Sequence, residues 1–210
     1  MGDDMIPVLL ADDETLIRSA MATMLGLEDD LDVVADVSTG EDLVRLWRAR
    51  VDGGLPTAVA VLDLQLPGID GIEVAQQILA MSPDAGTLIV TSHGRPGYLK
   101  RALSVGVRGF LPKTASAETL AAVIRSVHDG GRYVDPELAA EAISTGDSVL
   151  TAREADVLEF AIDGSSIDEI AARAHLSPGT TRNYLSSAMA KLAVANRYEA
   201  AVKARELGWI

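Results

Sequence analysis

The sequence predicts an α/β protein with a doubly wound parallel sheet, followed by a separate all-helical domain. Between residues 7 and 128, five short apolar runs alternate with amphipathic helical patterns. This alternation is typical of a parallel sheet that helices cover on both faces. From residue 149 to the end, helical patterns continue and no strand candidate occurs. The change of pattern therefore predicts two structural units.

The strand candidates are residues 7–11, 32–36, 58–62, 86–90 and 107–111. The helices between them are predicted from apolar residues at helical spacing, as in segments 14–26 and 117–128. Five strand–helix units of this kind predict a flavodoxin-like, doubly wound, five-stranded parallel sheet.

Four helices are predicted in the C-terminal unit. The segments Thr151–Glu154 and Ser166–Glu169 have the sequence of capping boxes, which begin helices. Ser177, with Pro178 after it, begins a third helix. A fourth helix is expected at about 197–207. The short connection between the second and third helices predicts a helix-turn-helix.

The composition of the chain limits the classes of protein to which it can belong. The chain has no cysteine, which excludes disulfides and thiolate metal sites. It has neither a long apolar stretch nor a signal peptide, so we expect a soluble, cytoplasmic protein without membrane insertion. The net charge is −12 in residues 1–147 but only −1 in residues 148–210. We therefore expect two domains with different roles, at 5–128 and 148–210, joined by a linker at 129–147.

Acidic residues close two of the predicted strands. Asp12 and Asp13 follow the first strand, and Asp63 follows the third. Binding sites in open parallel sheets form at the carboxyl ends of the strands, so these three side chains should share one pocket. Three carboxylates in one pocket repel one another unless a hard cation neutralises them. Mg2+ is the natural cation for oxygen ligands.

A hydroxyl group and an ammonium group should reach the same edge. Thr91 closes the fourth apolar run and Lys113 closes the fifth. This set of groups suits phosphoryl transfer to a carboxylate, which depends on positioning and charge neutralisation. Asp63 is the expected nucleophile, because the adjacent pair Asp12–Asp13 can hold the cation. Lys113 would then pair with the phosphoryl oxygens, and Thr91 would donate its hydroxyl to them.

Residues 5–128 resemble a bacterial response-regulator receiver domain. The matching residues are Asp12, Asp13, Asp63, Pro67, Gly68, Thr91, Phe110 and Lys113. The resemblance implies that Asp63 accepts a phosphoryl group from a sensor histidine kinase. It implies that Mg2+ is bound by Asp12, Asp13, Asp63 and the backbone carbonyl of Gln65. It also implies that Thr91 and Phe110 move on phosphorylation, as a two-state switch.

Residues 148–210 resemble the LuxR-type helix-turn-helix of the NarL/FixJ class of response regulators. The matching segments are 150–154, 169–171, 177–182, 191–192, 196–200 and 208–209. Segments 94–102 and 182–184 resemble the branch that includes fatty-acid desaturase regulators. These resemblances imply a transcription regulator that forms a homodimer on activation and binds double-stranded DNA at paired half-sites.

The third helix of the C-terminal unit would enter the major groove. Arg182, Asn183 and Ser186 lie on one side of it, where arginine can read guanine and asparagine can read adenine. The methyl group of Thr181 is expected to contact thymine. Phosphate contacts are expected from Thr180, Tyr184 and Lys191. The fourth helix, with Ala201 and Val202 on one side, is the expected dimer interface.

Two alternative functions remain open. The first is a constitutive DNA-binding regulator whose receiver works without phosphorylation. The second is a Mg2+-dependent aspartyl phosphatase, although such enzymes typically carry Asp-x-Asp on a single strand. Otherwise we expect no enzymatic activity beyond self-phosphorylation and self-dephosphorylation at Asp63. The sequence leaves open whether phosphorylation promotes dimers or frees the recognition helix.

Overall fold

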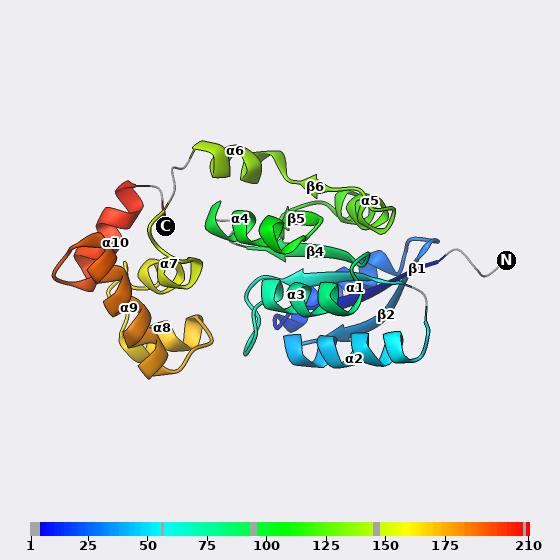
Figure 1. Ribbon diagram of the computed structural model, residues 1–210, viewed down its shortest axis with the longest axis horizontal. Coiled ribbons are helices and arrows are strands. Elements are labelled where there is room, and N and C mark those ends of the chain that lie inside the picture. The colour runs from blue at the N-terminus through cyan, green and yellow to red at the C-terminus, as the bar shows by residue number, and fades with distance from the viewer. Residues whose placement is uncertain (1–4, 56, 93–95, 145–147, 208) are drawn as a thin grey trace. The chain divides into compact units, whose positions relative to one another are not determined.

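The computed structural model describes residues 5–55, 57–92, 96–144, 148–207 and 209–210 (Figure 1). The chain divides into two compact units. The first, here called the sheet unit, comprises Met1–Gly94 and Arg101–Asp135. The second, here called the helical unit, comprises Arg95–Lys100 and Pro136–Ile210.

The sheet unit is built on a parallel sheet with the strand order β2-β1-β3-β4-β5-β6. Its strands are β1 (Ile6–Ala11), β2 (Leu31–Val37), β3 (Val59–Asp63), β4 (Gly86–Thr91), β5 (Gly109–Pro112) and β6 (Tyr133–Val134). The five predicted strands are confirmed, each with bounds within two residues of those expected. β6 was not predicted, because a two-residue strand produces no apolar run.

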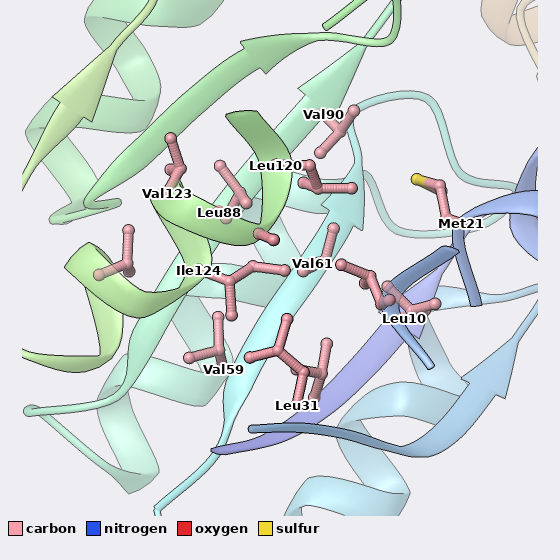
Figure 2. Close-up of a cluster of buried hydrophobic side chains, with 14 of the residues drawn as sticks. Leu10, Met21, Leu31, Val59, Val61, Leu88, Val90, Leu120, Val123 and Ile124 are labelled. Atoms are coloured by element: carbon pink, nitrogen blue, oxygen red, sulfur yellow. The ribbon is translucent and has the colours of Figure 1, made fainter. Parts of the chain in front are cut away.

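Helices cover both faces of this sheet. They are α1 (Thr15–Leu25), α2 (Gly40–Asp52), α3 (Gly71–Met81) and α5 (Ala117–His128). A further helix, α4 (Pro96–Val105), begins in the helical unit and ends in the sheet unit. Figure 2 shows the core in which Leu10, Val61 and Leu88 of the sheet pack with Met21 of α1 and Ile124 of α5. Every residue of β3 is buried, as expected for a central strand covered on both sides.

The start of α3 is fitted closely to the end of β3. Asp70 caps α3 and forms a capping box with Glu73, in which each side chain accepts a hydrogen bond from the other residue's backbone. Gly71 then packs directly on the backbone of Asp63. A Cβ atom at position 71 would lie 2.1 Å from the Asp63 carbonyl oxygen, so only glycine fits here. The backbone of Asp63 is thus held from behind by α3.

The helical unit confirms the predicted helix-turn-helix. Its helices are α6 (Pro136–Ser144), α7 (Ala152–Glu159), α8 (Ile167–Arg173), α9 (Pro178–Leu192) and α10 (Arg197–Glu206). The predicted capping boxes begin α7 and α8, and Ser177 caps α9. α7 ends at Glu159, and Gly164 lies after it with a φ of 83°.

Two further expectations bear on the organisation of the chain. The segment expected as a linker, 129–147, contains β6 and α6, while its residues 145–147 lie outside the described part. None of the helices in the described ranges is long and apolar enough to cross a membrane.

Candidate functional site

Two of the predicted carboxylates meet at the carboxyl edge of the sheet. Asp12 follows β1 and Asp63 ends β3, and these neighbouring strands pair Ala11 with Leu62. Both side chains are buried. The third carboxylate of the cluster is Glu14, and oxygen atoms of Asp12, Glu14 and Asp63 all lie within 4.8 Å of one another. The sequence therefore predicted two members of this group, Asp12 and Asp63, and the structure adds Glu14 to them.

Lys113 binds all three carboxylates. Its Nζ lies 2.7 Å from Glu14 Oε1, 2.8 Å from Asp12 Oδ2 and 3.0 Å from Asp63 Oδ2. Its position is set by the end of the sheet, because the Lys113 backbone N–H donates to the Thr91 carbonyl at 2.8 Å. The strand pairing thus carries the ammonium group to the carboxylates, as the sequence analysis expected.

The other predicted receiver residues surround this cluster. Thr91 is buried at the end of β4, and Phe110 is fully buried in β5. The backbone N–H of Gln65 donates to Asp63 Oδ1 at 3.3 Å, which places the Gln65 backbone beside the carboxylate. Asp13 is half-buried and lies outside the group of three carboxylates.

Burial shapes the electrostatics of the site. Burial raises the pKa of Asp63 to about 6, against the attraction of Lys113 and with the repulsion of Asp12. Burial likewise raises the pKa of Asp12, although Lys113 opposes it. Burial alone would lower the pKa of Lys113, but its carboxylate partners outweigh burial and raise that pKa. The lysine therefore stays charged, and it compensates the carboxylates only partly.

The donor set fits a hard cation. Asp12 Oδ2 is buried and, apart from the nearby ammonium group of Lys113, has no hydrogen-bonding partner. Burial raises the pKa of Asp12 and of Asp63, so a further cation would stabilise their ionised forms. Carboxylate and carbonyl oxygens are the ligands that Mg2+ prefers.

The helical unit presents a polar face on α9. Arg182, Asn183 and Ser186 are exposed on this helix, while Thr180 and Tyr184 are half-buried beside them. Its N-terminus is fixed by Ser177, whose side chain accepts from the Thr180 backbone N–H at 3.1 Å. These positions leave the predicted base-reading side chains open to a ligand.

Some predicted contacts of the helical unit do not agree with the structure. Thr181 is fully buried and its hydroxyl donates to the Ser177 carbonyl at 3.1 Å, so the expected thymine contact is wrong. Of the two residues expected at the dimer interface, Ala201 is buried and cannot contact another copy, while Val202 is half-buried. Small and β-branched residues suit a helix core as well as a surface, and the sequence pattern did not distinguish the two.

Lys191 is engaged within the helical unit. Its Nζ donates to Glu154 Oε2 at 2.7 Å, and Ser187 Oγ donates to Glu154 Oε1 at 2.6 Å. Burial would raise the pKa of Glu154, but these donors outweigh it and lower that pKa. Glu154 therefore does more than cap α7. It also ties α7 to α9 from the buried side.

A doubly wound receiver fold with an acidic edge and a helix-turn-helix unit define a response regulator with a DNA-binding output. The chain belongs to this family. Residues 8–125 match the response regulator receiver domain, and residues 148–204 match the LuxR family of bacterial regulatory proteins. Both resemblances drawn from the sequence are confirmed, and the family is not one of conventional enzymes.

Individual relatives are similar over almost their whole length. The chain is 39% identical to the transcriptional regulatory protein DesR of Bacillus subtilis, covering 98% of this chain and 99% of DesR. It is 34% identical to the DNA-binding transcriptional activator DevR/DosR of Mycobacterium tuberculosis, covering 97% and 95% respectively. The crystal structure of the response regulator ChrA of a heme-sensing two-component system has a TM-score of 0.55, with 30% identity over 99% of this chain and 100% of ChrA.

Proposed function

We propose that Asp63 accepts a phosphoryl group from a sensor histidine kinase in a Mg2+-dependent reaction, and that phosphorylation promotes dimerisation and sequence-specific binding to double-stranded DNA. The observation that carries this proposal is the buried Asp63 carboxylate 3.0 Å from the Lys113 ammonium group, beside the buried Asp12. This arrangement offers a nucleophile, a cation for the phosphoryl oxygens and carboxylates for a metal.

The transfer step needs few catalytic groups. An Asp63 oxygen forms a bond to phosphorus while the phosphorus–nitrogen bond of the kinase phosphohistidine breaks, and the histidine nitrogen leaves with the electron pair. Lys113 holds a phosphoryl oxygen on the side of β5. Asp12, Asp13, Asp63 and the Gln65 carbonyl would hold Mg2+, which neutralises charge on the transferring group.

The signal then passes to the sheet. Thr91 and Phe110 lie on the neighbouring strands β4 and β5, where Ile89 pairs with Phe110 and Thr91 pairs with Pro112. We propose that the Thr91 hydroxyl turns to the phosphoryl group and that Phe110 changes rotamer with it. Both side chains are buried, so a charge added at Asp63 would change how they pack inside the sheet unit and not only the charge at its surface.

The output surface is α9. Arg182, Asn183 and Ser186 would read base edges in the major groove, and Thr180 and Tyr184 would contact phosphates. The helical unit has a net charge close to zero, so one copy gains little non-specific attraction to DNA. Two copies on paired half-sites would bind far more tightly. The relative DevR/DosR is named as a DNA-binding activator, which supports this output.

Beryllofluoride, a phosphoryl mimic, tests the proposal. The full chain is titrated with beryllofluoride and Mg2+, and its mass is followed by analytical ultracentrifugation. The DNA sequences that it binds are selected from a pool of random duplexes. We expect dimerisation and tighter binding to the selected DNA, both abolished by Asp63→Asn. Arg182→Ala should retain dimerisation and lose sequence preference.

The alternatives give different results. A constitutive regulator would bind the selected DNA equally well with and without beryllofluoride. An aspartyl phosphatase would turn over a small phosphate ester and lose that activity in Asp63→Asn. Either result would contradict the proposed switch.

A further inference from the structure

We infer that Glu14 is a positioning residue for the phosphoryl-transfer site: it holds the Lys113 ammonium group while Asp63 is unphosphorylated and gives it up when a phosphoryl group arrives. The inference rests on the proposed role of Asp63. It adds a residue that controls how readily Asp63 enters and keeps the phosphorylated state.

The ammonium group of Lys113 has no capacity to spare. A lysine has three N–H donors, and Lys113 Nζ has three carboxylate neighbours at 2.7, 2.8 and 3.0 Å. The shortest of these distances is the one to Glu14. The lysine side chain is only 6% exposed, so it has little access to other partners. Lys113 can therefore bind a phosphoryl oxygen on Asp63 only by releasing a carboxylate.

Glu14 is the partner that can be released at low cost. Asp12 is fully buried, and leaving its charge without a partner there would be expensive. Asp63 itself carries the phosphoryl group. The Glu14 side chain, in contrast, is 53% exposed and can turn into water. The exchange therefore replaces Glu14 by the incoming phosphoryl oxygen.

The side chain of Glu14 has no competing structural role at the start of α1. Glu14 is the N-cap residue of that helix, but its side chain makes no capping hydrogen bond. The local turn is held instead by its backbone N–H, which donates to Asp12 Oδ1 at 2.8 Å. Substitution by glutamine leaves this backbone contact in place, so the variant should fold normally.

Two effects of Glu14 act in the same direction. Its contact with Lys113 stabilises only the unphosphorylated state, and its negative charge repels a phosphoryl group in the same pocket. Removing the charge should therefore favour the phosphorylated state. Because Glu14 is exposed and screened, we expect a change of about two- to fivefold in affinity for a phosphoryl mimic.

The experiment compares three full-length proteins: wild type, Glu14→Gln and Glu28→Gln. Beryllofluoride affinity is measured by isothermal titration calorimetry at saturating Mg2+, so that changes in metal affinity do not enter. Glu28→Gln is the matched control, because it also removes one negative charge from the sheet unit and breaks an ion pair, the 2.6 Å pair with Arg125. Glu28 itself lies far from Lys113 along the chain. We expect Glu14→Gln to bind more tightly than wild type and Glu28→Gln to bind like wild type.

Salt provides a second readout. At about 1 M salt the electrostatic screening length is about 3 Å. The ratio of the beryllofluoride affinity of Glu14→Gln to that of wild type should then fall towards one. Equal or weaker binding by Glu14→Gln at low salt overturns the inference, even when wild type responds to beryllofluoride. If wild type itself does not bind beryllofluoride, the proposed function fails as well, so the two failures are distinguishable.

Discussion

At the residue scale, Asp63 combines reactivity with a cost in stability. The folded protein buries this carboxylate and raises its pKa from 3.8 to about 6. At pH values between these two, the folded state binds a proton that the unfolded state releases. Asp63 therefore favours folding most at low pH, and its contribution is lost as the pH rises through about 6. At neutral pH the folded protein holds Asp63 ionised against the cost of its burial and, to a smaller extent, the repulsion of Asp12.

Asp63→Asn should accordingly stabilise the metal-free protein at neutral pH. We expect the free energy of unfolding to rise by about 1–2 kcal/mol at pH 7, less than the full pKa shift implies, because Lys113 loses an ionic partner. The gain should decline as the pH falls through 6 and vanish near pH 4. Urea unfolding in a Trp209→Phe background, with Trp47 fluorescence reporting the sheet unit, measures it. A gain that is independent of pH would refute the electrostatic origin.

The residue scale also shows what the sequence can and cannot predict. Asp12, Asp63, Thr91 and Lys113 were predicted because each ends an apolar run, and parallel strands bring such ends together. Glu14 was missed, because it belongs to a helix start and reaches the site only through its long side chain. Whether a polar residue such as Thr181 faces the core or the solvent depends on packing between helices, which periodicity does not define.

At the element scale, α5 has the bounds that were predicted from its apolar residues at helical spacing. Its cap is Ser116, whose side chain accepts from the Thr119 backbone N–H at 3.2 Å. α3 illustrates a contact that no cap reveals, since Gly71 is required by the backbone of Asp63 behind it. Asp63 is thus coupled to α3 through a backbone contact.

Gly71→Ala should destabilise the sheet unit by about 1–3 kcal/mol and displace the Asp63 backbone. The control is Ser19→Ala, because Ser19 is exposed on α1 of the sheet unit and alanine favours the helix. The same Trp47 unfolding measurement applies, together with beryllofluoride affinity. If Gly71→Ala left both unchanged, the close contact with the Asp63 carbonyl would have no energetic role.

The tie between α7 and α9 gives a second prediction at this scale. Lys191→Met leaves the buried Glu154 without its cationic partner and should cost about 1–2 kcal/mol at neutral pH. The lowered pKa of Glu154 means that its contribution is present above its ordinary pKa of 4.5 and is lost as the pH falls below it. The cost of Lys191→Met should therefore disappear in acid.

Urea unfolding followed by circular dichroism measures this cost. Arg182→Met removes a positive charge from the exposed face of the same helix and should change stability little. A penalty for Lys191→Met that persists in acid would assign the effect to packing and not to the ion pair.

At the scale of the whole molecule, charge separates input from output. Residues 1–147 carry most of the net charge of −13, while residues 148–210 are nearly neutral. A DNA-binding unit without an excess of positive charge should depend on the number of copies that bind and on specific contacts. In the proposed switch, dimerisation would therefore be an effective point of control.

The salt dependence of DNA binding should reveal that control. The slope of log affinity against log salt is set by the number of phosphates contacted. We expect beryllofluoride with Mg2+ to roughly double the magnitude of this slope, measured on DNA selected from the random pool, because two copies contact twice as many phosphates. Asp63→Asn should keep the smaller slope. An unchanged slope in wild type would mean that the same number of copies binds in both states.

The two-residue strand β6 affects how copies of the chain can meet. It pairs Tyr133 and Val134 with β5 and closes that margin of the sheet. At the opposite margin, β2 carries Asp32 and Asp36. Short and charged margins resist the addition of a foreign strand. We therefore expect copies of the sheet unit not to join edge to edge into fibres, so that the proposed dimer would have to form through contacts between side chains.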